Sequence, residues 1–105
     1  MHHRDIEERS LLLARAIAER IDADPLRCGV DQARAVCRRW RETGDSRDLR
    51  IWSETLEKPW EEIRAVLLDS SEGGRRLRQS NPFCGILTPQ ERWAIYREFR
   101  EHEAA

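Results

Sequence analysis

Hydrophobic residues recur at intervals of three and four along most of the chain, which is the spacing of one face of an α-helix. The first of these stripes consists of Ile6, Leu13, Ile17 and Ile21. We expect residues 1–5, which precede it, to form a disordered N-terminus. Leu11 and Leu12 make this stripe wider than one core face requires, so they are candidates for contact with a second surface, such as another subunit.

A second stripe predicts a second helix. It consists of Leu26, Val30, Ala33, Cys37 and Trp40. Asp24 is a good N-cap and Pro25 suits the first helical position, where a missing N–H costs little, so we expect the helix to open at this pair. Thr43-Gly44 is expected to close it, since glycine is common just beyond a helix C-terminus.

A third stripe is interrupted by a proline. It consists of Leu49, Trp52, Leu56, Trp60, Ile63 and Leu67. Proline inside a helix costs about 3 kcal/mol, so the sequence predicts two helices or a sharp kink, with Pro59 opening the second. The short basic segment that begins near Ser71-Glu72 contains Gly73-Gly74, and we expect a single turn or a short helix there.

The last helix has the clearest start signal in the chain. Thr88 is a good N-cap, Pro89 fits the first helical position, and Glu91 can reach back to the Thr88 amide, which completes a capping box. Two apolar rows follow, formed by Trp93 with Tyr96 and by Ile95 with Phe99.

Sustained strand alternation and hairpin turns are lacking in the sequence. We therefore predict an all-α fold of about five to six short helices, with residues 6–103 forming one domain. The helices that contain Leu26, Leu49 and Trp93 are expected to supply most of its core.

The connection between the basic segment and the last helix is unusually apolar. Ser80-Asn81-Pro82 marks a turn, because the residue before a proline is disfavoured in helical geometry. Phe83 and Ile86 then lie inside the connection. Such a loop either folds back onto its own domain, which is the commoner arrangement, or offers these side chains to a partner.

The region from Arg75 to Arg100 resembles the C-terminal part of a family of small bacterial antitoxin-like or regulator-like proteins. The matching positions are Leu77, Arg78, Gln79, Ser80, Pro82, Phe83, Cys84, Gly85, Ile86, Leu87, Thr88 and Pro89. The resemblance extends over most of the chain and implies a component that is encoded beside a toxin. Members of this family often carry an N-terminal helix-turn-helix domain that binds DNA. Here only residues 1–10 precede the first apolar run, so we expect the resemblance to apply to the domain that follows the DNA-binding one.

Charge and cysteine content narrow the function classes. The chain of 105 residues carries 19 basic and 20 acidic residues, for a formal net charge of −1. A general binder of phosphate backbones would show a basic excess or a basic face.

The three cysteines contain no C-x-x-C pair, which is typical of free thiols in a reducing compartment. With no apolar run long enough to cross a bilayer, the expected localisation is cytoplasmic, without a membrane partner.

Catalytic chemistry has little support in the sequence. His102-Glu103 lacks the second histidine of a zinc-binding helix motif, and Gly73-Gly74 does not form a phosphate-binding loop after a strand. Cys84 has no internal histidine to activate it. We therefore predict a protein that is not an enzyme, with no catalytic, metal-binding or cofactor-binding residues and no cofactor.

Three binding hypotheses remain. The first is a small protein-binding module, an antitoxin-like component that binds and neutralises a cognate toxin protein. Its candidate partner-binding residues are Arg75, Arg78, Gln79, Pro82, Phe83, Ile86 and Leu87. The second is a nucleic-acid-binding transcriptional regulator that uses arginines such as Arg38, Arg39 and Arg41 together with Arg75–Arg78. The third is a helical domain that only self-associates as a homo-oligomer.

Overall fold

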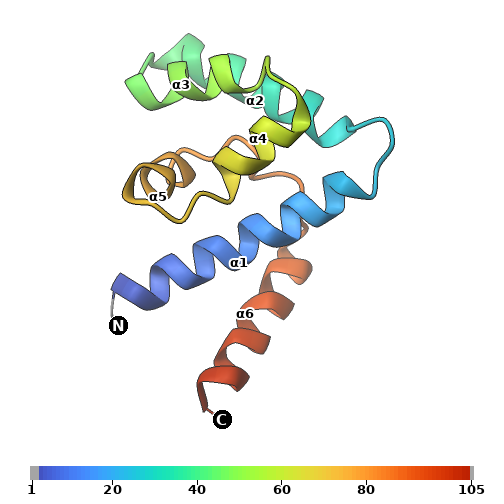
Figure 1. The fold of residues 1–105 in the computed structure, drawn as a ribbon, viewed down its shortest axis with the longest axis vertical. Helices are drawn as coiled ribbons and strands as arrows, with labels where there is room; N and C mark the ends of the chain where they lie inside the picture. The colour runs from blue at the N-terminus through green and yellow to red at the C-terminus, as the bar shows by residue number, and fades with distance from the viewer. Residues whose placement is uncertain (1–2, 105) are drawn as a thin grey trace.

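The computed structural model describes residues 3–104, and describes side chains for residues 7–101. Between residues 3 and 104 the chain forms six α-helices and no strand, so the all-α prediction is confirmed (Figure 1). The helices are α1 (His3–Asp22), α2 (Cys28–Thr43), α3 (Arg47–Thr55), α4 (Trp60–Leu67), α5 (Glu72–Arg78) and α6 (Pro89–Ala104). The first helix begins at His3, three residues before the expected start, while Met1 and His2 lie outside the described residues. None of the described helices is long and apolar enough to span a bilayer.

The first helix is the centre of the arrangement. α1 lies between α6 on one side and the array of α2 to α5 on the other (Figure 1). It contacts α2, α4 and α5 within that array, whereas α6 makes its main contact with α1 alone among the described helices. The first and last helices are therefore neighbours in space although they are at opposite ends of the described chain.

The third stripe of the sequence forms the middle of the core. All six of its members, from Leu49 to Leu67, are buried. Trp52 is fully buried, and its ring meets that of Phe83 edge to face, with centroids 6.0 Å apart. Its indole Nε1 also donates a hydrogen bond to the carbonyl oxygen of Leu77 at 2.8 Å, which ties α3 to α5. The expected break is confirmed as well, because α3 ends at Thr55 and α4 begins directly after Pro59.

The second helix begins later than the sequence indicated. α2 starts at Cys28, and Asp24-Pro25 belongs to the turn before it. The Asp24 carboxylate accepts hydrogen bonds from the backbone N–H groups of Leu26 and Cys28, at 3.1 and 2.8 Å, so it caps a turn that continues only later into helix. Leu26 is consequently 79% exposed, and the prediction that it belongs to the core was wrong.

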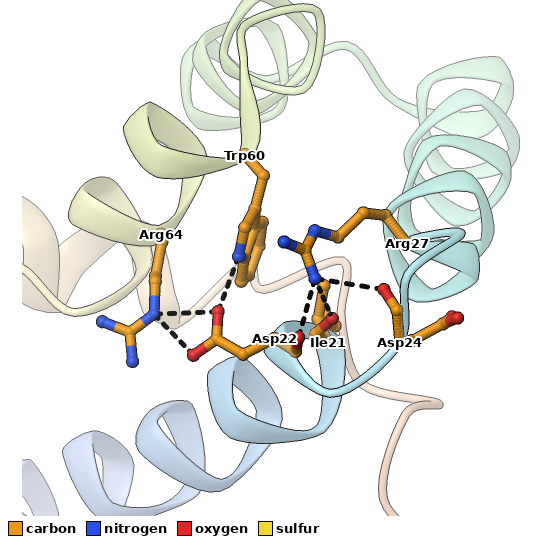
Figure 2. A network of polar contacts seen from close by, with 6 residues as sticks. All are labelled: Ile21, Asp22, Asp24, Arg27, Trp60 and Arg64. Atoms are coloured by element: carbon orange, nitrogen blue, oxygen red, sulfur yellow. Dashed lines mark hydrogen bonds and ion pairs between the residues drawn. The ribbon is translucent and has the colours of Figure 1, made fainter.

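An arginine holds this turn in place. Arg27 has a left-handed backbone with φ of 51°, which is uncommon for a residue with a Cβ. Its Nη1 donates to the carbonyl oxygens of Ile21, Asp22 and Asp24, at 2.8, 2.9 and 3.0 Å (Figure 2). The carbonyls of Ile21 and Asp22 lie at the C-terminal end of α1, where helix carbonyls lack partners inside the helix, and that of Asp24 lies in the turn that follows. The guanidinium therefore caps α1 while its backbone redirects the chain into α2.

The last helix starts as predicted but packs differently. The Thr88 hydroxyl accepts from the Glu91 N–H at 3.1 Å, and the Thr88 N–H donates to the Glu91 carboxylate at 3.0 Å, which confirms the capping box. Trp93, however, is 60% exposed, so its expected place in the core was wrong. The inward side of α6 is formed by half-buried side chains such as Ile95 and Tyr96, because α6 packs mainly against α1 among the described helices.

Candidate functional site

The apolar loop between α5 and α6 folds back onto the domain. Pro82 and Phe83 are fully buried and Leu87 is almost so, while Ile86 is half-buried. The Asn81 carboxamide oxygen accepts from the Phe83 N–H at 2.8 Å and sets the turn that directs the ring inward. Of the two arrangements open from the sequence, the structure shows the folded-back one, and this corrects the picture of Phe83 as an exposed contact.

Arg78 is also buried, and its hydrogen bonds are internal. The guanidinium donates to the Ser10 hydroxyl at 3.0 Å and to the carbonyl oxygens of Leu67 and Asp69, at 3.2 and 2.5 Å. Burial lowers the pKa of Arg78, and the nearby Asp69 carboxylate opposes that change. Because its donors satisfy carbonyls at the C-terminal end of α4 and a hydroxyl on α1, Arg78 joins three helices.

The other basic residues of α5 are paired with carboxylates. Arg75 forms an ion pair with Glu7 of α1, and Arg76 pairs with Asp48 of α3 at 3.0 Å. On α2, Arg41 donates to Asp45 at 2.9 Å. Each pair reduces the positive charge that these arginines can present to a phosphate backbone. Gln79, between α5 and the loop, is exposed.

A pocket of about 330 Å³ lies where α1, the loop and α6 meet. We call it the arginine pocket. Its lining residues are Arg9, Ser10, Leu13, Ile17, Arg78, Asn81, Phe83, Cys84, Leu87, Arg92 and Tyr96. One wall is the α1 face around Leu13, the opposite wall is the first half of α6, and the buried loop residues form the floor.

The charged residues that line this pocket are all arginines. Three arginines line it, at positions 9, 78 and 92, and none of the described lining residues is acidic. The Arg9 guanidinium carbon lies 5.8 Å from the ring centroids of both Tyr96 and Phe99, so cation–π attraction holds this charge beside α6. Arg92 is half-buried on the α6 wall. The pocket lining thus combines apolar side chains with two half-buried arginines, Arg9 and Arg92, because the guanidinium of Arg78 is buried and donates internally.

A second hollow lies on the other side of the contact between α1 and α6. This groove, of about 480 Å³, is lined by Glu8, Leu11, Leu12, Arg15, Ile95, Glu98 and Phe99. We call it the leucine groove. Leu11 and Leu12, which widened the first stripe of the sequence, are half-buried here.

No family model matches the sequence, and none of the curated proteins or solved structures compared with it is a match.

Sequence reasoning located only part of the arginine pocket. Arg78, Phe83 and Leu87 of the predicted site line it, whereas Arg75, Gln79, Pro82 and Ile86 do not. The α1 and α6 walls were missed, including Arg9 and Arg92. Their meeting depends on a contact between segments more than seventy positions apart, as the Arg20–Glu91 ion pair between the same helices illustrates with a separation of 71. No local signal in the sequence reports such a contact.

The cysteines and acidic residues do not form a further site. The residues that the structure describes contain no group of three histidine, cysteine or carboxylate side chains close enough to hold a metal ion. Cys37 is buried, and burial raises the pKa of its thiol. The pKa of Cys28 is also raised, chiefly by the negative charge of Asp24. A raised pKa keeps both thiols protonated, which makes them poor nucleophiles.

Proposed function

We propose that this chain is a small protein-binding module that recognises a cognate protein through the arginine pocket and neutralises it, as an antitoxin-like component does. The observation that carries the proposal is the composition of the pocket: its lining combines apolar side chains with the half-buried Arg9 and Arg92, and none of the described lining residues is acidic. The resemblance of the Arg75–Arg100 region to antitoxin-like proteins supports the choice of a toxin as the partner.

The pocket defines the chemistry of its occupant. The half-buried Leu13 and Tyr96 in its lining favour an aliphatic or aromatic side chain, because burial of such a side chain releases water from both surfaces. Arg9 and Arg92 at the rim favour a carboxylate close to that side chain, since guanidinium groups bind carboxylates in forked geometry. The expected ligand is therefore a segment of the partner that carries an apolar anchor next to an acidic residue.

The proposal is tested with the product of the gene next to this one. The two proteins are expressed together, and the dissociation constant of the purified complex is measured by calorimetry. We expect Arg92→Glu to weaken the complex by at least about tenfold, because it places a carboxylate where the partner's carboxylate binds. Arg97→Glu is the matched control, since Arg97 is an exposed arginine of the same helix outside the pocket.

The proposal is overturned if Arg92→Glu and Arg97→Glu bind the neighbouring protein equally well. It is overturned equally if the chain fails to relieve the toxicity of that protein in cells. Binding of DNA with a steep dependence on salt concentration, in place of the protein, would favour the regulator hypothesis.

A further inference from the structure

The leucine groove follows one exposed face of α1. Leu11 and Leu12 are half-buried at its centre, Glu8 lies toward the N-terminal end, and Arg15 is exposed toward the C-terminal end. Ile95 and Phe99 of α6 form an apolar wall on one side. The α1 side of the groove thus has an apolar centre with one acidic and one basic residue at opposite ends, and Glu98 adds a carboxylate on the α6 side.

These four positions have a symmetry that suits an antiparallel copy of the same helix. A helix turns by about 100° per residue, so residues seven apart point in nearly the same direction. Glu8 and Arg15 are seven apart and point outward together, while Leu11 and Leu12 lie to either side of that direction. The midpoint between Glu8 and Arg15 is also the midpoint between Leu11 and Leu12. A two-fold axis at that midpoint exchanges the two ends of the face.

We propose that the chain forms a two-fold symmetric dimer in which the α1 helices of two copies pack antiparallel in the leucine groove. In this register Glu8 of each copy faces Arg15 of the other, and Leu11 and Leu12 each meet their own equivalents. A two-fold interface requires this self-complementarity, because each contact of one residue with another occurs twice. A parallel pairing in register would instead place Glu8 against Glu8 and Arg15 against Arg15.

The length of α1 and the position of α6 fit such an interface. A helix of 20 residues is about 30 Å long, enough to present several turns to a partner. The α6 wall extends the contact, since Ile95 and Phe99 flank the α1 helix of the second copy. The four helices of the two copies then form a bundle in which leucine, isoleucine and phenylalanine side chains pack between neighbouring helices.

The dimer and the arginine pocket use different sides of α1. The pocket takes Leu13 and Ile17, whereas the groove takes Leu11 and Leu12. The dimer therefore does not rest on the proposed function, and each copy keeps its pocket accessible. An assembly with two equivalent pockets can bind two partner molecules.

The mass of the protein in solution tests the proposal. Sedimentation equilibrium across the micromolar range should give twice the chain mass at the upper end. Leu12→Glu should give a monomer at every concentration, with an unchanged helical circular dichroism spectrum, because Leu12 is only half-buried in the single chain. Ala94→Glu, at an exposed position of α6 outside the groove, is the control and should dimerise as the original does.

Charge exchange tests the register itself. Glu8→Arg and Arg15→Glu should each weaken the dimer by roughly tenfold, because each creates two like-charge contacts. The double variant, with both changes, should recover most of the original affinity, since the exchanged charges again face each other. A monomer across the whole range overturns the proposal, and so does a double variant weaker than either single one. If the protein is a monomer on its own and Leu12→Glu abolishes binding of the toxin partner, the groove is the binding site for that partner and not a dimer interface.

Discussion

The indole Nε1 of Trp60 donates a hydrogen bond to the Asp22 carboxylate at 2.7 Å, which joins the first residue of α4 to the last residue of α1. Arg64, one turn further along α4, reaches the same carboxylate at 3.0 Å (Figure 2). The hydrogen bond from Trp60 lowers the pKa of Asp22, and the bond and charge of Arg64 add to this effect against the opposing effect of burial. One carboxylate thus ties the central helix to the middle of the core.

The lowered pKa of Asp22 predicts a dependence of stability on pH. Because the folded protein binds the proton less tightly than the unfolded chain, Asp22 stabilises the fold above its ordinary pKa of 3.8. That contribution is lost as the pH falls below 3.8 through the lower pKa of the folded state. Asp22→Asn should therefore reduce the melting temperature at neutral pH and make the decline below 3.8 shallower. Thermal melts over this pH range measure both effects.

A matched control separates this effect from general acid sensitivity. Glu57→Gln, at an exposed position between α3 and α4, should leave unchanged both the melting temperature at neutral pH and its decline at acid pH, which we call the acid limb. Asp24 and Asp69 also have lowered pKa values, caused mainly by backbone hydrogen bonds, so the Asp22 variant should keep part of the acid limb. An acid limb identical in Asp22→Asn and the original protein would contradict the assignment.

The burial of Phe83 predicts that it stabilises the fold. Its side chain is fully buried against Trp52, so Phe83→Ala should reduce the free energy of unfolding by about 3–5 kcal/mol. Phe83→Asp should prevent folding, because a carboxylate would replace a buried ring. Urea titrations followed by tryptophan fluorescence provide the measurement. Cys84→Ala, at the adjacent exposed position, is expected to change stability by less than about 0.5 kcal/mol.

The paired glycines of α5 should respond in opposite directions to alanine. A Cβ added at Gly74 would lie 2.2 Å from the carbonyl oxygen of Asp69, so Gly74→Ala must displace that turn and should cost about 1–3 kcal/mol. A Cβ at Gly73 meets nothing closer than 3.8 Å, and Gly73→Ala should stabilise the helix by about 0.5–1 kcal/mol. Thermal unfolding of the two variants gives the comparison. The same sign of change in both would contradict it.

The weak packing of α6 predicts early local opening. α6 has one main helical neighbour and no fully buried side chain between residues 89 and 101. Hydrogen exchange monitored by mass spectrometry should show faster exchange in α6 than in α3 or α4. Thr88→Ala, which removes a capping hydroxyl, should accelerate exchange in α6 selectively. Equal protection in α6 and α4 would show that α6 opens only with the whole domain.

The sequence predicted best where burial follows from spacing within one segment. The stripe from Leu49 to Leu67 needed only its own periodicity and Pro59 to be placed correctly. The prediction that Leu26 lies in the core was wrong because Arg27 adopts a left-handed backbone, a conformation that arginine does not favour and that the sequence therefore does not indicate. The prediction that Trp93 lies in the core was wrong for another reason. Periodicity identifies the apolar rows of a helix but does not show which row will face the neighbouring helix.

The site was harder to predict than the fold for a related reason. Arg78 was recognised as part of a motif, yet its use as a buried donor to Leu67 and Asp69 depends on where α4 ends in space. Arg9 gained its place only through Tyr96 and Phe99, which approach it from the other end of the described chain. The charge and hydropathy of a residue can be read from the sequence. Which distant residues it contacts depends on the tertiary structure, and this is why the pocket was predicted only in part.

The pairing of α1 with α6 also determines when this domain can be completed during synthesis. The ribosome makes α1 before α6, and loop closure becomes more costly as the intervening segment lengthens. A nascent chain that has reached only residue 88 holds the floor of the arginine pocket without its α6 wall, and the α1 side chains opposite that wall face water. The pocket can therefore receive a partner in its finished form only after translation has passed α6.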